Sequence, residues 1–255
     1  MTDTFYTSLR EEAEKLDISL EDATIQQLFT YYQMLVETNK VMNLTAITEE
    51  QDVVKKHFID SMAIVKAVNA ITSNVSRETS DISTFFKDKT MIDVGTGAGF
   101  PGLVLKIVFP GLHVVLTDSL NKRITFLDHV IRALGLTGVE TVHGRAEDLG
   151  QSPVYREKFD FAVSRAVANL ATLSEYDLPF VRKNGYFIAY KSGEILEETE
   201  KAAHAIGLLG GKQEARICYM LPDSDIARSL IVIRKAKETP RKYPRKSGMP
   251  SKTPL

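Results

Sequence analysis

At 255 residues the chain is long for one domain and short for two equal ones, so we expect one core domain with an extension. The formal net charge is −1, and the single cysteine, Cys218, excludes an internal disulfide and a zinc site of paired thiols. No apolar run approaches the roughly 20 residues that span a bilayer, and the N-terminus is acidic. We therefore expect a cytoplasmic protein that does not enter the membrane.

Residues 1–70 are predicted to form a helical cap. Apolar residues recur at helical spacing over 5–16, 25–35 and 53–65. The last of these segments carries His57, Asp60 and Ser61 on neighbouring helix faces, and a histidine in an apolar helix is more often a packed structural residue than a catalytic one. Residues 71–89 are rich in Ser and Thr and are predicted to be a linker.

From residue 90 to 235 strands and helices alternate, which predicts a Rossmann-like α/β domain with a doubly wound, mostly parallel sheet of seven strands. The predicted strands are 91–94, 113–117, 139–143, 159–164 and 186–190, with helices over 100–109, 121–134, 169–181 and 193–207. Two last strands, 215–221 and 229–233, are separated by a turn alone. They should pair as an antiparallel hairpin at one edge, with Cys218 in the core, and residues 236–255 follow as a basic tail. This arrangement resembles the class I methyltransferase fold.

The stretch MIDVGTGAGFPG, Met91 to Gly102, begins the sheet. Gly95, Gly97 and Gly99 let the chain turn sharply after a buried strand and approach a ligand closely. The helix that follows points its free N–H groups back at that turn. This pattern predicts a nucleotide or cofactor site, although a glycine turn that merely closes a strand onto a helix has the same appearance.

Asp93 separates two kinds of cofactor. Gly97, Gly99 and Gly102 also fit the dinucleotide fingerprint G-x-G-x-x-G, which alone is weak support for an NAD or flavin site. A carboxylate under the cofactor is unfavourable beside a pyrophosphate and favourable beside an ammonium or a sulfonium. S-adenosylmethionine carries both cations, so Asp93 favours the first motif of S-adenosylmethionine-dependent methyltransferases.

Ligands of such folds lie over the carboxyl ends of the strands, so the residues that follow the next four strands are candidates to line the same site. Asp118 can accept from both ribose hydroxyls, as it would in an oxidoreductase too. A backbone N–H of Ala146 or Glu147 can meet the adenine ring. Arg165 follows the next strand, where the methionine end of the cofactor and the acceptor should meet. Lys191 borders the same cleft and could hold an RNA phosphate.

The sequence lacks a motif that would indicate one kind of methyl acceptor, an exocyclic amine. An Asn-Pro-Pro-Tyr or Asp-Pro-Pro-Tyr stretch, the usual device for methylating an exocyclic amine, is absent. A ring nitrogen such as guanine N7 needs no general base and demands only in-line positioning. The tail supplies charge for phosphates and one ring for stacking, through Arg241, Lys242, Tyr243, Arg245 and Lys246.

Six stretches together resemble the RsmG (GidB) family, bacterial methyltransferases of 16S ribosomal RNA guanine N7. They are Asn43 to Thr45, His57 to Ser61, Asp93 to Gly102, Asp118 to Ser119, Ser164 to Ala166 and Tyr243 to Leu255. The resemblance implies S-adenosylmethionine as donor and a 7-methylguanine in the decoding region as product. It also implies that the partner is 16S rRNA in the small ribosomal subunit or its precursor, and that Gly95, Phe100, Ala146, Glu147 and Arg165 contact the cofactor.

Other functions stay open at this point. A methyltransferase of the same class could act on another RNA or on a small molecule. A dinucleotide-dependent oxidoreductase would use the glycines in the same way and would tolerate Asp93→Asn. An RNA-binding protein could retain the cofactor fold and transfer nothing. A long exposed apolar helix is absent from the sequence pattern, so we expect a monomer.

Overall fold

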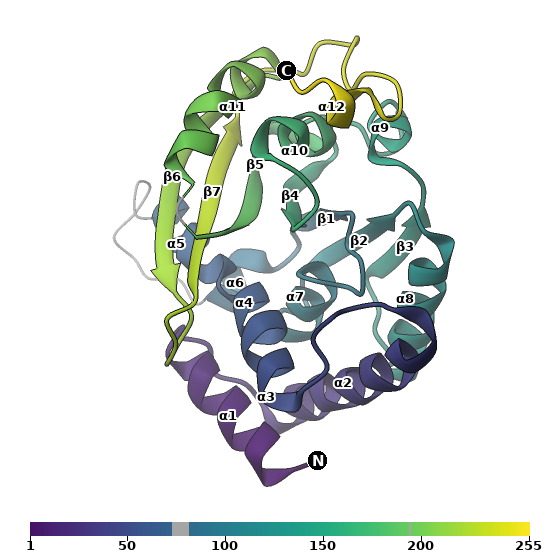
Figure 1. Ribbon diagram of the computed structural model, residues 1–255, viewed down its shortest axis with the longest axis vertical. Helices are drawn as coiled ribbons and strands as arrows, with labels where there is room; N and C mark the ends of the chain where they lie inside the picture. The colour runs from purple at the N-terminus through teal and green to yellow at the C-terminus, as the bar shows by residue number, and fades with distance from the viewer. Residues whose placement is uncertain (73–81, 194) are drawn as a thin grey trace.

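Figure 1 shows the computed structural model, which describes residues 1–72, 82–193 and 195–255; residues 73–81 of the predicted linker 71–89 lie outside these ranges. A seven-stranded sheet in the order β3-β2-β1-β4-β5-β7-β6 forms its centre. Its strands are β1 (Thr90–Val94), β2 (His113–Asp118), β3 (Val139–His143), β4 (Phe159–Arg165), β5 (Val181–Ser192), β6 (Gly211–Met220) and β7 (Ala227–Lys235). Strands β1 to β5 are parallel, and β7 pairs antiparallel with both β5 and β6. The predicted fold class, with its C-terminal hairpin, is confirmed.

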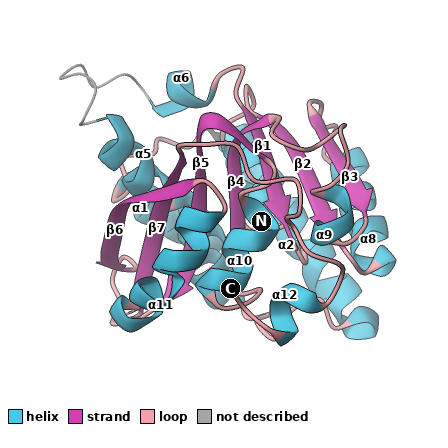
Figure 2. Cartoon of the chain, turned by 90° about the horizontal axis from the view of Figure 1, so that it is seen from above, coloured by secondary structure: helices cyan, strands magenta, loops and turns pink. Residues whose placement is uncertain are grey.

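Helices cover both faces of the sheet, as the view from above in Figure 2 shows. Those before β1 are α1 (Asp3–Glu14), α2 (Asp22–Met42), α3 (Glu50–Val53), a π-helix (Val54–Ile59), α4 (Asp60–Met62), α5 (Ile64–Thr72) and α6 (Ile82–Phe86). Those after it are α7 (Gly102–Val108), α8 (Asn121–Ala133), α9 (Ala146–Leu149), α10 (Leu170–Asp177), α11 (Leu196–Leu208) and α12 (Met249–Lys252). Among the residues described, no helix is long and apolar enough to span a bilayer.

The N-terminal helices share one hydrophobic core with the α7 and α8 side of the sheet. Phe58 of the π-helix and Tyr31 of α2 both pack against Phe100, with ring centroids 6.2 and 5.5 Å apart. A second core on the opposite face joins α10 and α11 to β4, β5 and β7. The cap is therefore packed directly on the sheet, and its loops reach the end of the sheet where the cofactor was predicted.

The edge strand β6 corrects one expectation. Its residues alternate, with Ala215, Ile217 and Tyr219 partly buried and Cys218 exposed between them. Because successive side chains of a strand point to opposite faces, a residue in an edge strand with one open face can lie outside the core. The prediction that Cys218 is a core residue was wrong.

The C-terminal residues 236–255 pack on the body beside α9 and α10, at the top of Figure 1. Arg245 binds the fully buried Glu175 through several hydrogen bonds of 2.6 to 3.1 Å. Tyr243 is 6% exposed, and its carbonyl oxygen accepts from Arg156 at 2.8 Å. The predicted basic tail is thus an ordered segment whose aromatic ring lies inside the protein.

Candidate functional site

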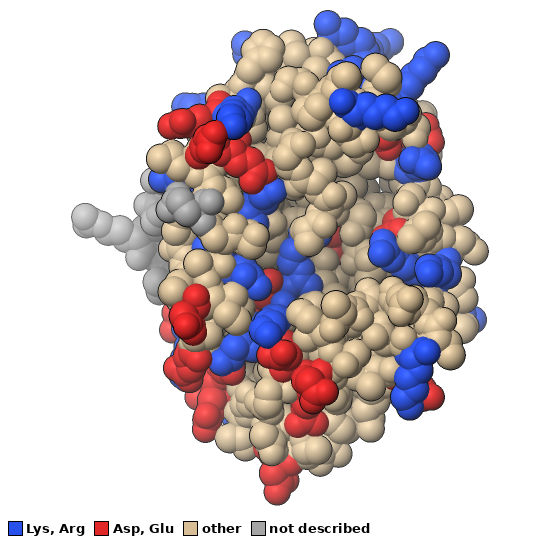
Figure 3. Space-filling view, viewed as in Figure 1, with Lys and Arg blue, Asp and Glu red and all other residues tan. Residues whose placement is uncertain are grey.

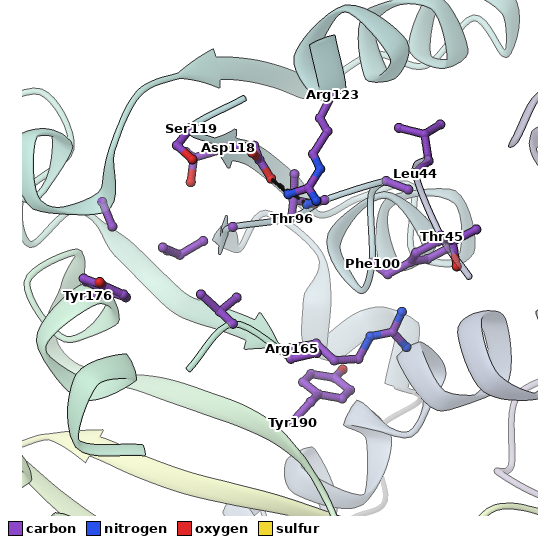
Figure 4. A pocket seen from close by; sticks show the side chains of 18 of the residues that line it. Leu44, Thr45, Thr96, Phe100, Asp118, Ser119, Arg123, Arg165, Tyr176 and Tyr190 are labelled. Carbon is purple, nitrogen blue, oxygen red and sulfur yellow. Dashed lines mark hydrogen bonds and ion pairs between the residues drawn. The ribbon is translucent and has the colours of Figure 1, made fainter. Parts of the chain in front are cut away.

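A cavity of about 680 Å³ lies over the carboxyl ends of the parallel strands, the place expected for a ligand in this kind of sheet. The glycine turn after β1 forms its floor. One end, which we call the nucleoside end, is lined by Asp118, Ser119, Arg123, Ala146, Glu147, Tyr176, Gly248 and Ser251. The other, the acceptor end, is lined by Leu44, Thr45, Ile47, Lys56, His57, Asp60, Arg165, Tyr190 and Arg228. Figure 4 shows side chains from both ends pointing into one continuous space.

The glycine turn has the backbone shape that its sequence predicted. Gly95, Gly97 and Gly99 have φ of +72°, +62° and +106°. A Cβ at Gly97 would meet no atom of the described chain within 4 Å, so this glycine borders open space. The turn is held from both sides, since Gly95 N–H donates to Thr117 O at 2.9 Å and the Tyr31 hydroxyl donates to Ala98 O.

Asp93 supports this turn from beneath. Its Oδ2 accepts from Thr96 Oγ1 and from Gly102 N, both at 2.7 Å, and the side chain is fully buried. Burial raises the pKa of this carboxyl to about 6. Asp93 does not appear among the described residues that line the cavity. The observed contacts of Asp93 thus fix the loop and the start of α7, and a direct contact with a cofactor stays a prediction.

At the nucleoside end, Asp118, which was predicted to bind the ribose, ends β2 and lines the cavity. Its Oδ2 accepts from Gly97 N at 3.0 Å and from Arg123 Nη1 at 3.1 Å, and its Oδ1 accepts from Leu120 N at 2.8 Å. These bonds orient the carboxylate at the edge of the cavity. Arg123, in the first turn of α8, was not predicted, because the helical pattern does not show that its side chain reaches back to Asp118.

The other wall of the nucleoside end combines α9 with the C-terminal segment. Ala146 and Glu147 line the cavity as predicted, but Glu147 Oε1 accepts from Gly248 N at 2.7 Å. Gly248 and Ser251 complete this wall. Neither residue was predicted to line the site, because local patterns in the stretch Tyr243 to Leu255 do not show that it reaches α9, 101 residues earlier in the chain.

At the acceptor end, Arg165 joins β4 to the N-terminal cap. Its Nη1 donates to Asp60 Oδ2 at 3.0 Å and to Lys56 O at 3.2 Å, and its guanidinium lies 5.2 Å from the centre of the Phe100 ring. Figure 4 shows it extending between Tyr190 and Phe100. Asp60 also lies 3.3 Å from Arg228 Nε, so its carboxylate binds two arginines. Phe100, predicted as a cofactor contact, is 6% exposed and forms part of this lining.

His57 lies on the π-helix from Val54 to Ile59, and both His57 and Asp60 line the cavity at this end. π-turns are frequent at functional sites. The pKa of His57 is lowered to about 3, first by burial and then by the Arg165 cation. His57 is therefore neutral at physiological pH.

The residues predicted to bind RNA differ in their surroundings. Lys191 lines the cavity, but its Nζ lies 2.6 Å from Glu198 Oε1 and 3.0 Å from Ala168 O, so it fixes the loop after β4. Arg241, Lys242 and Lys246 are exposed on the C-terminal segment, whereas Tyr243 and Arg245 hold that segment in place. RNA contacts by any of these residues stay a prediction.

Comparison with known proteins gives a consistent result. The family model described as GidB, rRNA small subunit methyltransferase G, matches residues 24–226. Proteins named ribosomal RNA small subunit methyltransferase G are similar along nearly the whole chain. One from Lachnoclostridium phytofermentans is 48% identical over 252 residues, covering 99% of this chain and 96% of its own length. Another from Alkaliphilus oremlandii is 51% identical over 248 residues, covering 97% of each.

Proposed function

This chain belongs to the GidB family, rRNA small subunit methyltransferase G, and on that premise we propose that it methylates N7 of one guanine in the decoding region of 16S rRNA. The methyl donor is S-adenosylmethionine. We further propose that the substrate is the small ribosomal subunit or its precursor, in the cytoplasm, and that the enzyme acts as a monomer.

The nucleoside end and the glycine turn fit the donor. Asp118 offers a fixed carboxylate for ribose hydroxyls, and Ala146 leaves space for a flat ring beside α9. The open space over Gly97 allows a ligand to approach the backbone closely. When bound, S-adenosylmethionine supplies a methyl group activated by the sulfonium. Arg165, which lines the acceptor end, would orient the methionine portion and the acceptor.

The observation that carries the proposal is that the proton acceptors at the acceptor end are already occupied. Asp60 binds Arg165 and Arg228, and His57 Nδ1 faces Arg165 Nη2 at 3.3 Å. The one lone pair of the neutral His57 ring faces a guanidinium, and the Asp60 carboxylate is held in ion pairs with two arginines, so neither group is directed at a substrate as a general base. Guanine N7 has a lone pair and no proton, so it needs orientation and no general base.

The surface around the cavity supports an RNA substrate. Figure 3 shows Lys and Arg side chains inside the central hollow of this face and along its upper edge. Lys56, Arg123, Arg145 and Arg228 line the cavity. Positive charge next to the acceptor end favours a phosphate backbone and would raise the rate of encounter with RNA.

The test is transfer of labelled methyl from S-adenosylmethionine to small subunits that lack their modifications, followed by mapping of the labelled base. Borohydride reduction and aniline cleavage identify 7-methylguanine. We expect one labelled guanine, with transfer strongly reduced in Arg165→Ala and unchanged in the control Arg132→Ala, which alters an exposed arginine of α8. Label on another base, or cofactor binding without transfer, would contradict the proposal.

A further inference from the structure

The hydrogen bonds of His57 fix which of its ring nitrogens carries the proton. Arg165 Nη2 lies 3.3 Å from Nδ1. Since a guanidinium has N–H donors and no acceptor, Nδ1 must present a lone pair. The proton of the neutral ring is therefore on Nε2, which donates to Thr45 Oγ1 at 2.9 Å. The ring is held in this orientation by stacking on Phe100, with centroids 4.3 Å apart and planes 17° apart.

Thr45 receives a second hydrogen bond, from Ile47 N at 3.0 Å. A hydroxyl oxygen has two lone pairs and one hydrogen. Because both lone pairs accept from within the protein, the hydroxyl hydrogen is left to donate elsewhere. Thr45 is half-buried and lines the acceptor end of the cavity, where it can meet a substrate. The contacts thus turn a threonine, which could accept or donate, into a donor.

We propose that the Thr45 hydroxyl donates to O6 of the acceptor guanine and so selects guanine over adenine, an inference that rests on the proposed methylation of guanine N7. Guanine presents O6 and N7 as adjacent acceptors, whereas adenine presents an amino group beside N7. A donor on O6 leaves N7 free to attack, and the same donor meets the hydrogens of an adenine amine. His57 acts as a positioning residue, because it reaches the substrate through Thr45.

The experiment pairs enzyme variants with a base analogue. Small subunits are reconstituted with ligated 16S rRNA that carries either guanine or 2-aminopurine, which keeps N7 and lacks O6, at the mapped position. Thr45→Val removes the hydroxyl at nearly constant shape, and Thr45→Ser retains it. Thr48→Val is the matched control. Thr48 lies in the same loop, and its backbone carbonyl, which the substitution retains, accepts the hydrogen bond of the Tyr32 hydroxyl.

On guanine we expect Thr45→Val to lower kcat/KM about 10- to 100-fold, with S-adenosylmethionine affinity unchanged. Thr45→Ser should stay within about threefold and Thr48→Val should match the wild type. On 2-aminopurine the wild type should lose a similar factor and Thr45→Val should lose nothing more. His57→Phe should also reduce the preference for guanine over 2-aminopurine, and His57→Gln, which can donate and accept at the same places, should restore part of it.

Two results would overturn the inference. One is a Thr45→Val variant whose kcat/KM on guanine equals that of the wild type. The other is a Thr45→Val variant whose kcat/KM on 2-aminopurine is lowered by the product of the two separate losses. If Thr45→Val does not fold, equal rates of the wild type on guanine and 2-aminopurine overturn it. The product separates this failure from that of the proposed function. A wild-type product other than 7-methylguanine refutes both, whereas 7-methylguanine made equally well by Thr45→Val refutes the role of Thr45 alone.

Discussion

Gly99 offers a sharp test of how the cap holds the glycine turn. An added Cβ at Gly99 would lie 2.5 Å from the Tyr31 hydroxyl, 2.9 Å from Leu127 Cδ2 and 3.0 Å from Leu103 Cβ. The backbone there has φ of +106°, which L side chains rarely adopt. Backbone strain of about 1 to 3 kcal/mol and overpacking of about 1 to 3 kcal/mol together predict that Gly99→Ala lowers the free energy of unfolding by about 2 to 6 kcal/mol.

Gly97→Ala is the matched control in the same turn. Its φ of +62° lies in the left-handed region, and its Cβ would meet open space. Strain alone predicts a loss of about 1 to 2 kcal/mol. Urea denaturation, with the slope checked to be equal among the variants, measures the difference. The reasoning is refuted if Gly99→Ala is no more destabilising than Gly97→Ala.

A double-mutant cycle identifies the contact responsible. Tyr31→Phe alone leaves Ala98 O without its hydroxyl donor and should lower the free energy of unfolding by about 1 to 3 kcal/mol. In the double variant the same change removes the atom nearest to the new Cβ. The double variant should therefore lose about 1 to 2 kcal/mol less free energy of unfolding than the sum of the two single losses. Additivity within about 0.5 kcal/mol would show that Tyr31 does not crowd Gly99.

Two further predictions concern buried charge. Arg245→Ala leaves the fully buried carboxylate of Glu175 without its arginine and should lower the free energy of unfolding by about 3 to 5 kcal/mol. Substitution of the exposed Arg241 by Ala should change it by less than about 0.5 kcal/mol. Similar values for the two variants in urea denaturation would contradict this prediction. Because the folded-state pKa of His57 is about 3 and the unfolded value is 6.5, the unfolded chain binds more protons between these values, so stability rises with pH in this window. The wild type should gain about 2 to 3 kcal/mol over His57→Gln between pH 4.5 and 7.5, and parallel pH profiles would show that His57 is not buried as the neutral base.

The sheet and the glycine turn were predictable because their signals are local. A buried apolar run, closely spaced glycines and strand-helix alternation specify β1, its turn and α7 within a few residues of their observed bounds. The rule that ligands lie over the carboxyl ends of parallel strands then placed Asp118, Ala146, Glu147 and Arg165 at the cavity without any knowledge of their contacts.

The features that could not be predicted depend on contacts between segments that are distant in the sequence. The positive charge of the C-terminal segment suggested an arm for RNA, but its conformation is set by Glu147 and Glu175, which bind Gly248 and Arg245 across 101 and 70 residues. The amino-acid composition of the segment does not predict which distant residues it will bind. Likewise, Thr45 and His57 belong to two separate stretches of the family resemblance, and their hydrogen bond joins a loop to the π-helix across 12 residues, a contact that helical periodicity does not reveal.

The N-terminal cap connects the two ends of the cavity. Tyr31 in α2 holds the glycine turn, on which we propose that the donor rests, and Thr45, His57 and Asp60 from the segment that follows line the acceptor end. Phe100 joins the two, because its ring stacks with Tyr31 and with His57, at centroid distances of 5.5 and 4.3 Å. In-line transfer requires the donor and the acceptor to be positioned relative to each other, because small displacements lower the rate steeply. Under the proposed function, supporting both ends on one aromatic cluster would provide that alignment, and the cap would then belong to the catalytic unit.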